Sequence, residues 1–275
     1  MARCWRRLIR FPRSCAAFAL NAIFAGGLTL FFAGCNQSDD IPEEVFDKSY
    51  PITPSTSLSV ANKDGTIRIY GGGPPVVKIH AVKRAYTQAR LHGIGIDVST
   101  QPDAVVVETK FPLRKGWWFA DRSGTVDYII VVPDGMNISR TELQAGEILV
   151  DGMRGQTTHA QLGSGRLFIH DCFGNVDLSV ASGNFTLIFD WWESKTFSVN
   201  ASMQDGNGFA YIPTESSFHL IAKTDNGKIG NDFAEQEDRR GDVVTKVDML
   251  VGTNNNVTIN LHAADGNLRI VEANP

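Results

Sequence analysis

Apolar and polar residues alternate along most of the chain from about residue 57 onward. Stretches such as "TIRIY", "TVDYIIVVP" and "NVTINL" carry apolar residues at alternate positions, and glycine-containing turns separate them. Because successive side chains of a strand point to opposite faces, this pattern predicts half-buried strands. Helical spacing is nearly absent: "KRAYTQARLH" fits either a helix or a strand followed by a loop. The pattern therefore predicts an all-β fold.

A turn of a small or polar residue plus glycine recurs through the second half of the chain. The glycines stand at positions 146, 165, 183, 208, 227 and 266, and the differences between successive positions are 19, 18, 25, 19 and 39. Glycine suits sharp corners because it adopts positive φ without steric cost. A regular period is typical of coils that bury their inward side chains only against neighbouring coils. The spacing predicts a β-solenoid or β-roll with about 19 residues per coil.

The N-terminus has the layout of an export signal. Five arginines precede an apolar run from Cys15 to Ala33, which Asn21 and Thr29 interrupt. A run of this length could also span a bilayer, with the arginines on the cytoplasmic side. We expect a signal peptide over 1–34, an acidic, proline-bearing tether over 35–55 and a β-strand repeat domain over 56–275.

Small residues directly precede Cys35. Phe32-Ala33-Gly34-Cys35 resembles the bacterial lipobox, with Phe32 where leucine is commonest. This resemblance implies cleavage before Cys35 and acylation of its thiol, which would anchor the protein in the membrane. An uncleaved helix is the alternative, and both alternatives place the residues after Cys35 outside the cytoplasm.

Loss of this signal would change the cysteine count and the charge. Cys172 would remain as the one free thiol, so the exported domain would have no internal disulfide. His170, Asp171 and Cys172 cannot form a triad from one strand, because neighbouring side chains do not share a face. We predict a small buried or turn cysteine. Without its five signal arginines the chain falls from a net charge of −4 to about −9, which disfavours nucleic acid as a partner.

A family resemblance covers roughly residues 50 to 272. It rests on "LSVANKDGTIRIYG", on "VDYIIVVPDGMNISRTELQAGEILVDGMRG" and on the serial Ser-Gly, Asn-Gly and Asp-Gly strands that follow. These stretches resemble the bacterial putative-adhesin family, described also as toastrack-like β-strand repeat domains of unknown function. The resemblance implies a right-handed β-solenoid or roll in an envelope protein, and it supplies no catalytic residues.

Two tryptophan pairs are the candidate ligand-binding residues. Trp117 and Trp118 lie in "KGWWFAD", between strands, and Trp191 and Trp192 lie in "FDWWESK", in the interval lengthened to 25. Tryptophans exposed in loops stack on sugar rings or enter a membrane interface. The alternative is that they fold back and cap the core.

Other chemistry has little support in the sequence. The six histidines lack metal-ligand spacing, and the Asp-Gly and Asn-Gly pairs do not keep the offsets of calcium-binding repeats. We predict no catalytic residue, no cofactor and no metal site. The predicted function is a non-enzymatic binding or scaffolding role in the bacterial envelope, at the outer membrane, toward an envelope protein or glycan. A polysaccharide-acting enzyme, with carboxylates about 5 to 10 Å apart in a groove, and a sensor subunit of an envelope-stress system are the alternatives.

Overall fold

The computed structural model describes residues 41–112, 123–234, 243–253 and 256–273. The chain divides into two units, and all of the described residues belong to the unit Asp40–Pro275. Cys35 and the apolar run before it lie outside the described residues, as do Trp117 and Trp118. Among the ranges given above, no helix has the length and apolarity that crossing a bilayer requires.

The described chain is all-β, as predicted, and its strands form a single open sheet. Its only helix within these ranges is α1 (Gln88–Gly93), which begins where the Thr87 side chain accepts the Arg90 N–H. The strands are β1 (Glu43–Pro51), β2 (Ser57–Tyr70), β3 (Val76–Arg84), β4 (Gly95–Thr100), β5 (Ala104–Lys110), β6 (Thr125–Val131), β7 (Asn137–Asp151), β8 (Thr157–His170), β9 (Asn175–Ile188), β10 (Phe197–Pro213), β11 (Phe218–Asn226), β12 (Ile229–Asn231), β13 (Lys246–Val251) and β14 (Val257–Ala273).

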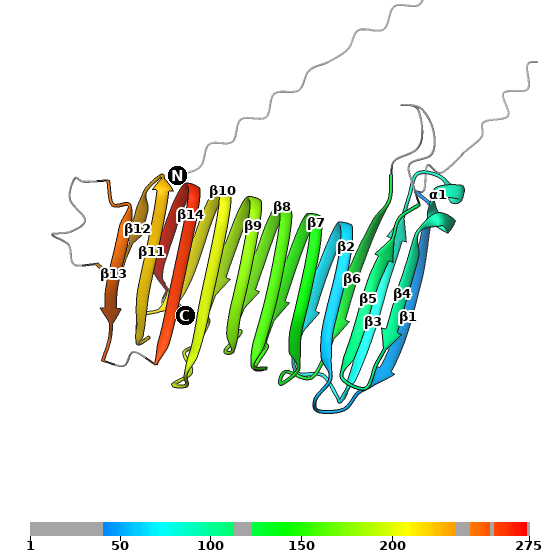
Figure 1. The fold of residues 1–275 in the computed structure, drawn as a ribbon, viewed down its shortest axis with the longest axis horizontal. Coiled ribbons are helices and arrows are strands. Elements are labelled where there is room, and N and C mark those ends of the chain that lie inside the picture. The colour runs from blue at the N-terminus through cyan, green and yellow to red at the C-terminus, as the bar shows by residue number, and fades with distance from the viewer. Residues whose placement is uncertain (1–40, 113–122, 235–242, 254–255, 274–275) are drawn as a thin grey trace, which may run out of the picture. The chain divides into compact units, whose positions relative to one another are not determined.

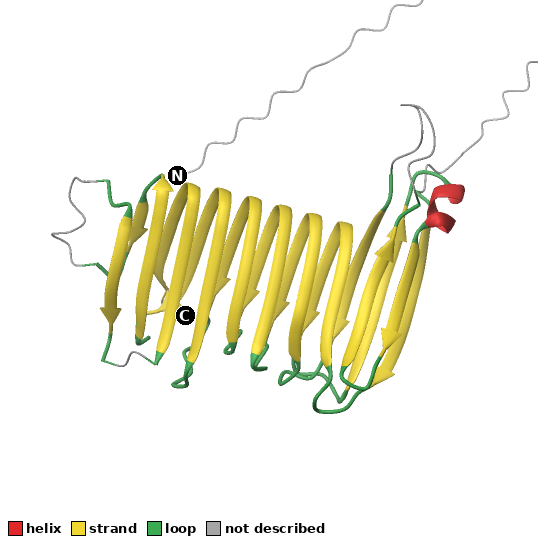
Figure 2. Cartoon of the chain, in the orientation of Figure 1, coloured by secondary structure: helices red, strands yellow, loops and turns green. Residues whose placement is uncertain are grey.

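Six long strands form a parallel stack in the order β2, β7, β8, β9, β10 and β14 (Figure 1). Glycine pairs with glycine across the stack, from Gly65 and Gly146 to Gly206 and Gly266. The ribbons curve over at one end of the stack, and short loops join them at the other (Figure 2). Each strand therefore contributes two straight halves that meet at a glycine.

The burial pattern shows why the strands bend without losing their core face. In β8, Leu162 and Leu167 are both buried although they are five residues apart, an odd separation that would put them on opposite faces of a flat strand. Gly165 lies between them with φ at 127°. The positive φ shifts the alternation by one position, so the apolar side chains of both halves point inward.

These corner glycines form a ladder that excludes side chains. We call the six paired glycines the glycine corner: Gly65, Gly146, Gly165, Gly183, Gly206 and Gly266. A Cβ on Gly165 would overlap the carbonyl oxygen of Gly146, and one on Gly183 would overlap that of Gly165. The predicted positive φ is confirmed at Gly165, Gly183 and Gly227.

The prediction that Gly208 is a corner residue is wrong. Gly206, not Gly208, pairs with Gly183 and has the positive φ, of 137°. Gly208 faces inward, where a Cβ would overlap the side chains of Phe185 and Leu268. Its lack of a side chain leaves room for these two neighbours, so the corner that follows Gly183 comes two positions earlier than the sequence predicts.

The end of the stack departs from chain order. β14 lies between β10 and β11 and pairs parallel with both, and β13 pairs antiparallel with β11. The long segment between Gly227 and Gly266 therefore holds β12, β13 and the first half of β14. Gly227 lies beside Gly266, and a Cβ on Gly227 would overlap the Gly266 carbonyl oxygen.

The N-terminal part is built mainly from antiparallel pairs. β3 lies between β1 and β6, and β6 pairs with the second half of β2. Strand β1 (Glu43–Pro51) occupies part of the segment expected to be a tether, and ion pairs from Glu43 to Arg84 and from Glu44 to Lys83 hold it against β3. One hydrophobic cluster runs from this part through the stack to β14.

Candidate functional site

A shallow polar groove crosses the outer face of the stack on the strand halves that precede the glycine corner. Its volume is about 400 Å³. Paired positions of successive strands line it in rows, since parallel strands in register place equivalent side chains side by side. The polar groove is lined by Arg140, Thr141, His159, Ala160, Gln161, Asp177, Leu178, Ser179, Asn200, Ala201, Ser202, Asn260 and His262.

The groove offers both hydrogen-bond donors and acceptors. Asn200 donates to Asp177 at 2.8 Å, and the same carboxylate lies 3.3 Å from His159 Nδ1. Ser202 donates to the Leu178 carbonyl at 3.3 Å. Amides, hydroxyls and one cation beside one carboxylate suit a polar ligand of little net charge.

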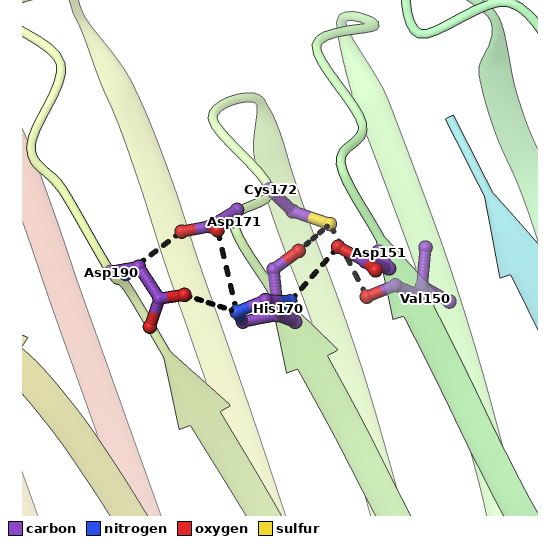
Figure 3. Close-up of polar contacts among 6 residues, drawn as sticks. All are labelled: Val150, Asp151, His170, Asp171, Cys172 and Asp190. Atoms are coloured by element: carbon purple, nitrogen blue, oxygen red, sulfur yellow. Dashed lines mark hydrogen bonds and ion pairs between the residues drawn. The ribbon is translucent and has the colours of Figure 1, made fainter. Parts of the chain in front are cut away.

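A second polar constellation lies at the opposite end of these strands, on the loops that join them. We call residues 152–156, 171–174 and 189–196 the loop edge. The His170 cluster, defined as Asp151, His170, Asp171 and Asp190, gathers where β7, β8 and β9 end (Figure 3). His170 Nδ1 lies 3.0 Å from Asp151 Oδ1, and Nε2 lies 3.1 Å from Asp190 Oδ2 and 3.3 Å from Asp171 Oδ2.

Three carboxylates around one imidazole dominate the electrostatics of this cluster. Burial, the largest single influence, lowers the pKa of His170, but the carboxylates of Asp171, Asp190 and Asp151 outweigh it and raise the pKa above its ordinary value. Burial raises the pKa of the Asp171 carboxyl, and the Asp190 N–H and the imidazole offset this only partly. The cluster remains rich in negative charge.

Cys172 is the small buried cysteine that the sequence predicts. The side chain is fully buried, and its thiol donates weakly to the His170 and Val150 carbonyls at 3.4 and 3.6 Å. Burial raises the pKa of the thiol to about 12, so the thiolate that would attack a substrate does not form near neutral pH.

The tryptophans of the loop edge have different environments. Trp191 is 45% exposed, and its ring lies 5.5 Å from the Phe173 ring and 5.8 Å from the Arg154 guanidinium carbon. Trp192 is half-buried and packs against the core, with ring centroids 5.5 to 5.6 Å from Phe189, Phe197 and Phe218. Trp191 is therefore the more exposed ring of this pair.

Sequence reasoning missed both polar constellations. It placed His170 and Asp171 on different faces of a strand, whereas the structure brings both of them together with Asp151. One signal was available: the chain separations from Asp151 to His170 and from His170 to Asp190 are 19 and 20, close to the interval between corner glycines. In parallel strands, side chains separated by one repeat become neighbours.

Comparison with known proteins finds similarity at the level of structure. No protein-family model matches the chain, and no curated protein matches it. A solved putative cell adhesion protein from Clostridium sporogenes is 14% identical, with a TM-score of 0.50, and the match covers 85% of this chain and 100% of that one. Putative adhesins from Bacteroides fragilis and Parabacteroides distasonis are 9% and 10% identical, with TM-scores of 0.27 and 0.28. These two matches cover 83% and 85% of this chain and 97% and 98% of those chains.

The Clostridium structure carries the conclusion, because its match extends over the whole of that protein. An identity this low establishes the fold and not the activity. The chain therefore has the fold of the putative cell adhesion protein from Clostridium, and the resemblance of its sequence to the putative-adhesin family is confirmed at the level of the fold.

Proposed function

We propose that this chain is a non-enzymatic, adhesin-like binding protein of the bacterial cell envelope, and that the polar groove is its binding face. The groove carries this proposal. It crosses five neighbouring strands, β7, β8, β9, β10 and β14, whose positions the glycine corner and the in-register ladder fix. A site on rigid strands is preorganised, so a ligand would bind without the cost of ordering a loop.

A glycan is the class of ligand that suits the groove best. Gln161, Asn200 and Ser202 present exposed amide and hydroxyl groups along it, and such groups match the hydroxyl groups of a sugar. Four strand spacings of about 4.8 Å give the groove a length of about 19 Å, enough for several sugar rings. Arg140 and Asp177 carry opposite charges, which favours a neutral or weakly charged chain of hydroxyl-bearing rings over a strong polyanion.

A glycan and envelope-protein pull-down with the unit Asp40–Pro275 tests this proposal. The groove variant Gln161→Ala/Asn200→Ala/Ser202→Ala should lose the captured glycan and keep its melting temperature. The matched control, Thr186→Ala/Tyr211→Ala, alters the outer face of β9 and β10 beyond the glycine corner and should retain binding. Equal binding by both variants would contradict the groove assignment, and capture of a shortened glycan would favour the polysaccharide-acting enzyme.

The exposed ring of Trp191 is a proposed accessory contact of the same binding protein. A sugar ring could contact its exposed part beside Arg154, which an ion pair with Glu193 at 3.0 Å holds in place. The assignment of Trp117 and Trp118 as ligand-binding residues stays a prediction. Trp191→Ala should weaken capture of the glycan by less than the groove variant does, and an unchanged affinity would remove Trp191 from the site.

The proposed location follows from the N-terminal sequence. A lipid on Cys35 would hold the domain at the membrane, at the outer membrane of the envelope, with the segment from Cys35 to β1 as a short connection. Mass spectrometry of the native protein should find an acylated N-terminal Cys35, and Cys35→Ser should accumulate as a longer precursor. Cleavage at another residue would contradict the lipid anchor.

We also propose that the parallel stack is a right-handed β-solenoid in which one coil runs from each corner glycine to the next. The nearly constant spacing of Gly146, Gly165 and Gly183, the corners of β7, β8 and β9, supports the coil length that the sequence predicts. The burial of apolar side chains on both sides of each corner supports a closed coil, because both strand halves face the same core.

A further inference from the structure

Three atoms of the His170 cluster converge on one point of the loop edge. They are His170 Nε2, Asp171 Oδ2 and Asp190 Oδ2, and all lie within 4.8 Å of one another. Two oxygens stand 3.1 and 3.3 Å from the nitrogen. Ligand atoms about 2.0 to 2.2 Å from one metal ion are themselves about 3.0 to 3.5 Å apart. The two nitrogen-to-oxygen distances are thus already those of a shared metal ion.

Asp171 gives an observation that does not depend on this spacing. Its side chain is only 4% exposed, and its Oδ1 accepts the Asp190 N–H at 2.9 Å. Oδ2 points into the cluster and meets His170 Nε2 as an ion pair, while the hydrogen bond of Nε2 is to Asp190. The Asp190 N–H and the imidazole thus hold both oxygens of this carboxylate in place, and Oδ2 faces the point on which His170 Nε2 and the Asp190 carboxylate converge.

Asp151 supplies the support that metal-binding histidines commonly have. Its carboxylate accepts a hydrogen bond from His170 Nδ1 at 3.0 Å, on the side of the ring away from Asp171 and Asp190. This contact holds the Nδ1 proton and fixes the orientation of the ring, so that Nε2 faces the other two carboxylates (Figure 3). A metal ion bound there would displace the Nε2 proton, and the Nε2 lone pair would then point at the ion.

The other histidine pairs of the chain provide an internal comparison. His80, His159, His219 and His262 each form an ion pair with one aspartate among the described residues. His170 alone of these five meets three carboxylates. Because a single imidazole cannot balance three negative charges, the His170 cluster has an excess of negative charge that a divalent ion would compensate.

We propose that His170, Asp171 and Asp190 form a binding site for a divalent transition-metal ion, with Asp151 as a positioning residue. One imidazole and two carboxylates suit Zn²⁺ or Mn²⁺ better than Mg²⁺ or Ca²⁺, which prefer oxygen ligands alone. The Asp190 side chain is 59% exposed, so an ion can enter from solvent, and water can complete the coordination. This site would join the ends of β8 and β9 at the loop edge.

Calorimetric titration of the unit Asp40–Pro275 with Zn²⁺ tests the proposal, after removal of any purification tag. This unit contains all of the core residues that the structure describes. The unaltered domain should bind one ion, which should also raise its melting temperature. Asp190→Asn removes an exposed ligand, and Asp151→Asn removes the positioning carboxylate. Asp151→Asn should weaken Zn²⁺ binding by about 10- to 100-fold, and Asp190→Asn by at least as much.

His159→Gln is the matched control, because it alters an exposed His–Asp pair that has one carboxylate. It should bind Zn²⁺ like the unaltered domain, and Mg²⁺ should bind much more weakly than Zn²⁺ to both proteins. Circular dichroism confirms that each variant is folded. Absence of one-to-one Zn²⁺ binding, an unchanged affinity in Asp190→Asn, or an equal loss in His159→Gln would overturn the proposal.

Discussion

The two ends of the stack, where the strands bend at the glycine corner and where loops join them, obey different constraints. At the glycine corner, each strand passes so close to the next that a Cβ would overlap a carbonyl oxygen. At the loop edge, the connections vary from four residues (171–174) to eight (189–196), and they carry the His170 cluster and both described tryptophans of the "FDWWESK" stretch. One end of the stack therefore fixes the register, and the other is free to vary in length and chemistry.

This contrast explains how a repetitive fold can acquire a function. The corner specifies which residues of successive strands become neighbours, and the same register brings Asp151 and His170 together at the loop edge. The same register places the side chains that line the polar groove in rows. Substitutions at the corner should therefore act on stability, whereas substitutions at the loop edge or in the groove should act on binding.

The largest expected effect is at the corner. Gly165→Ala would place a methyl group against the Gly146 carbonyl at a φ of 127°, so both steric overlap and backbone strain oppose folding. We expect a loss of at least about 3 kcal/mol in the free energy of unfolding, measured by urea denaturation. Gly135→Ala is the control, since a Cβ there meets nothing within 4 Å, and should change stability by less than about 0.5 kcal/mol. Similar losses in both variants would show that the corner is not specially constrained.

A smaller effect should separate the two tryptophans of the loop edge. Trp192→Ala removes a ring that packs on Phe189, Phe197 and Phe218, and should cost about 3 kcal/mol. Trp191→Ala removes a ring that is 45% exposed and should cost about 1 kcal/mol or less. Thermal unfolding of the two variants measures this difference. The reverse order would mean that Trp191 caps the core and Trp192 does not.

The sequence predicted the strands and most of the corner because both depend on local chemistry. Alternation predicts strands wherever one face is buried, and glycine marks positions where φ is positive. The stretch "QDGNGFA" contains two glycines, and either could occupy the corner. Gly206 occupies it because Gly208 lies against Phe185 and Leu268 of the neighbouring strands. Those neighbours are distant in the chain, so no local pattern resolves the choice.

The candidate sites were harder to predict for the same reason. His170 meets Asp151 through the pairing of β7 with β8, and it meets Asp190 only because the loop after β9 begins beside it. The insertion of β14 between β10 and β11 likewise places Asn260 and His262 in the groove, against chain order. The repeat spacing in the sequence predicts the contact between His170 and Asp151. It does not predict that β14 lies between β10 and β11.

The smallest expected effect is within the core of the stack. The Thr141 hydroxyl is buried and finds no hydrogen-bond partner among the described residues, so Thr141→Val should leave stability unchanged or raise it by up to about 1 kcal/mol. Thr224→Val is the matched control. The Thr224 hydroxyl donates to the Gly266 carbonyl at 2.7 Å, so its loss should lower stability by about 1 kcal/mol. A loss in Thr141→Val as large as in the control would show that its hydroxyl has a partner, such as water.

The central claim is that the distance between corner glycines defines one interchangeable unit of the stack, and a pair of deletions tests it most directly. Removing residues 147–165, one full repeat, joins Gly146 to Arg166 in the register that Gly165 now has. The shortened domain should still unfold cooperatively in urea. Removing only residues 147–164 leaves one extra residue, which reverses the faces of the following half-strand and should abolish the cooperative transition. Equal behaviour of the two deletions, or a folded domain only from the second, would contradict the account.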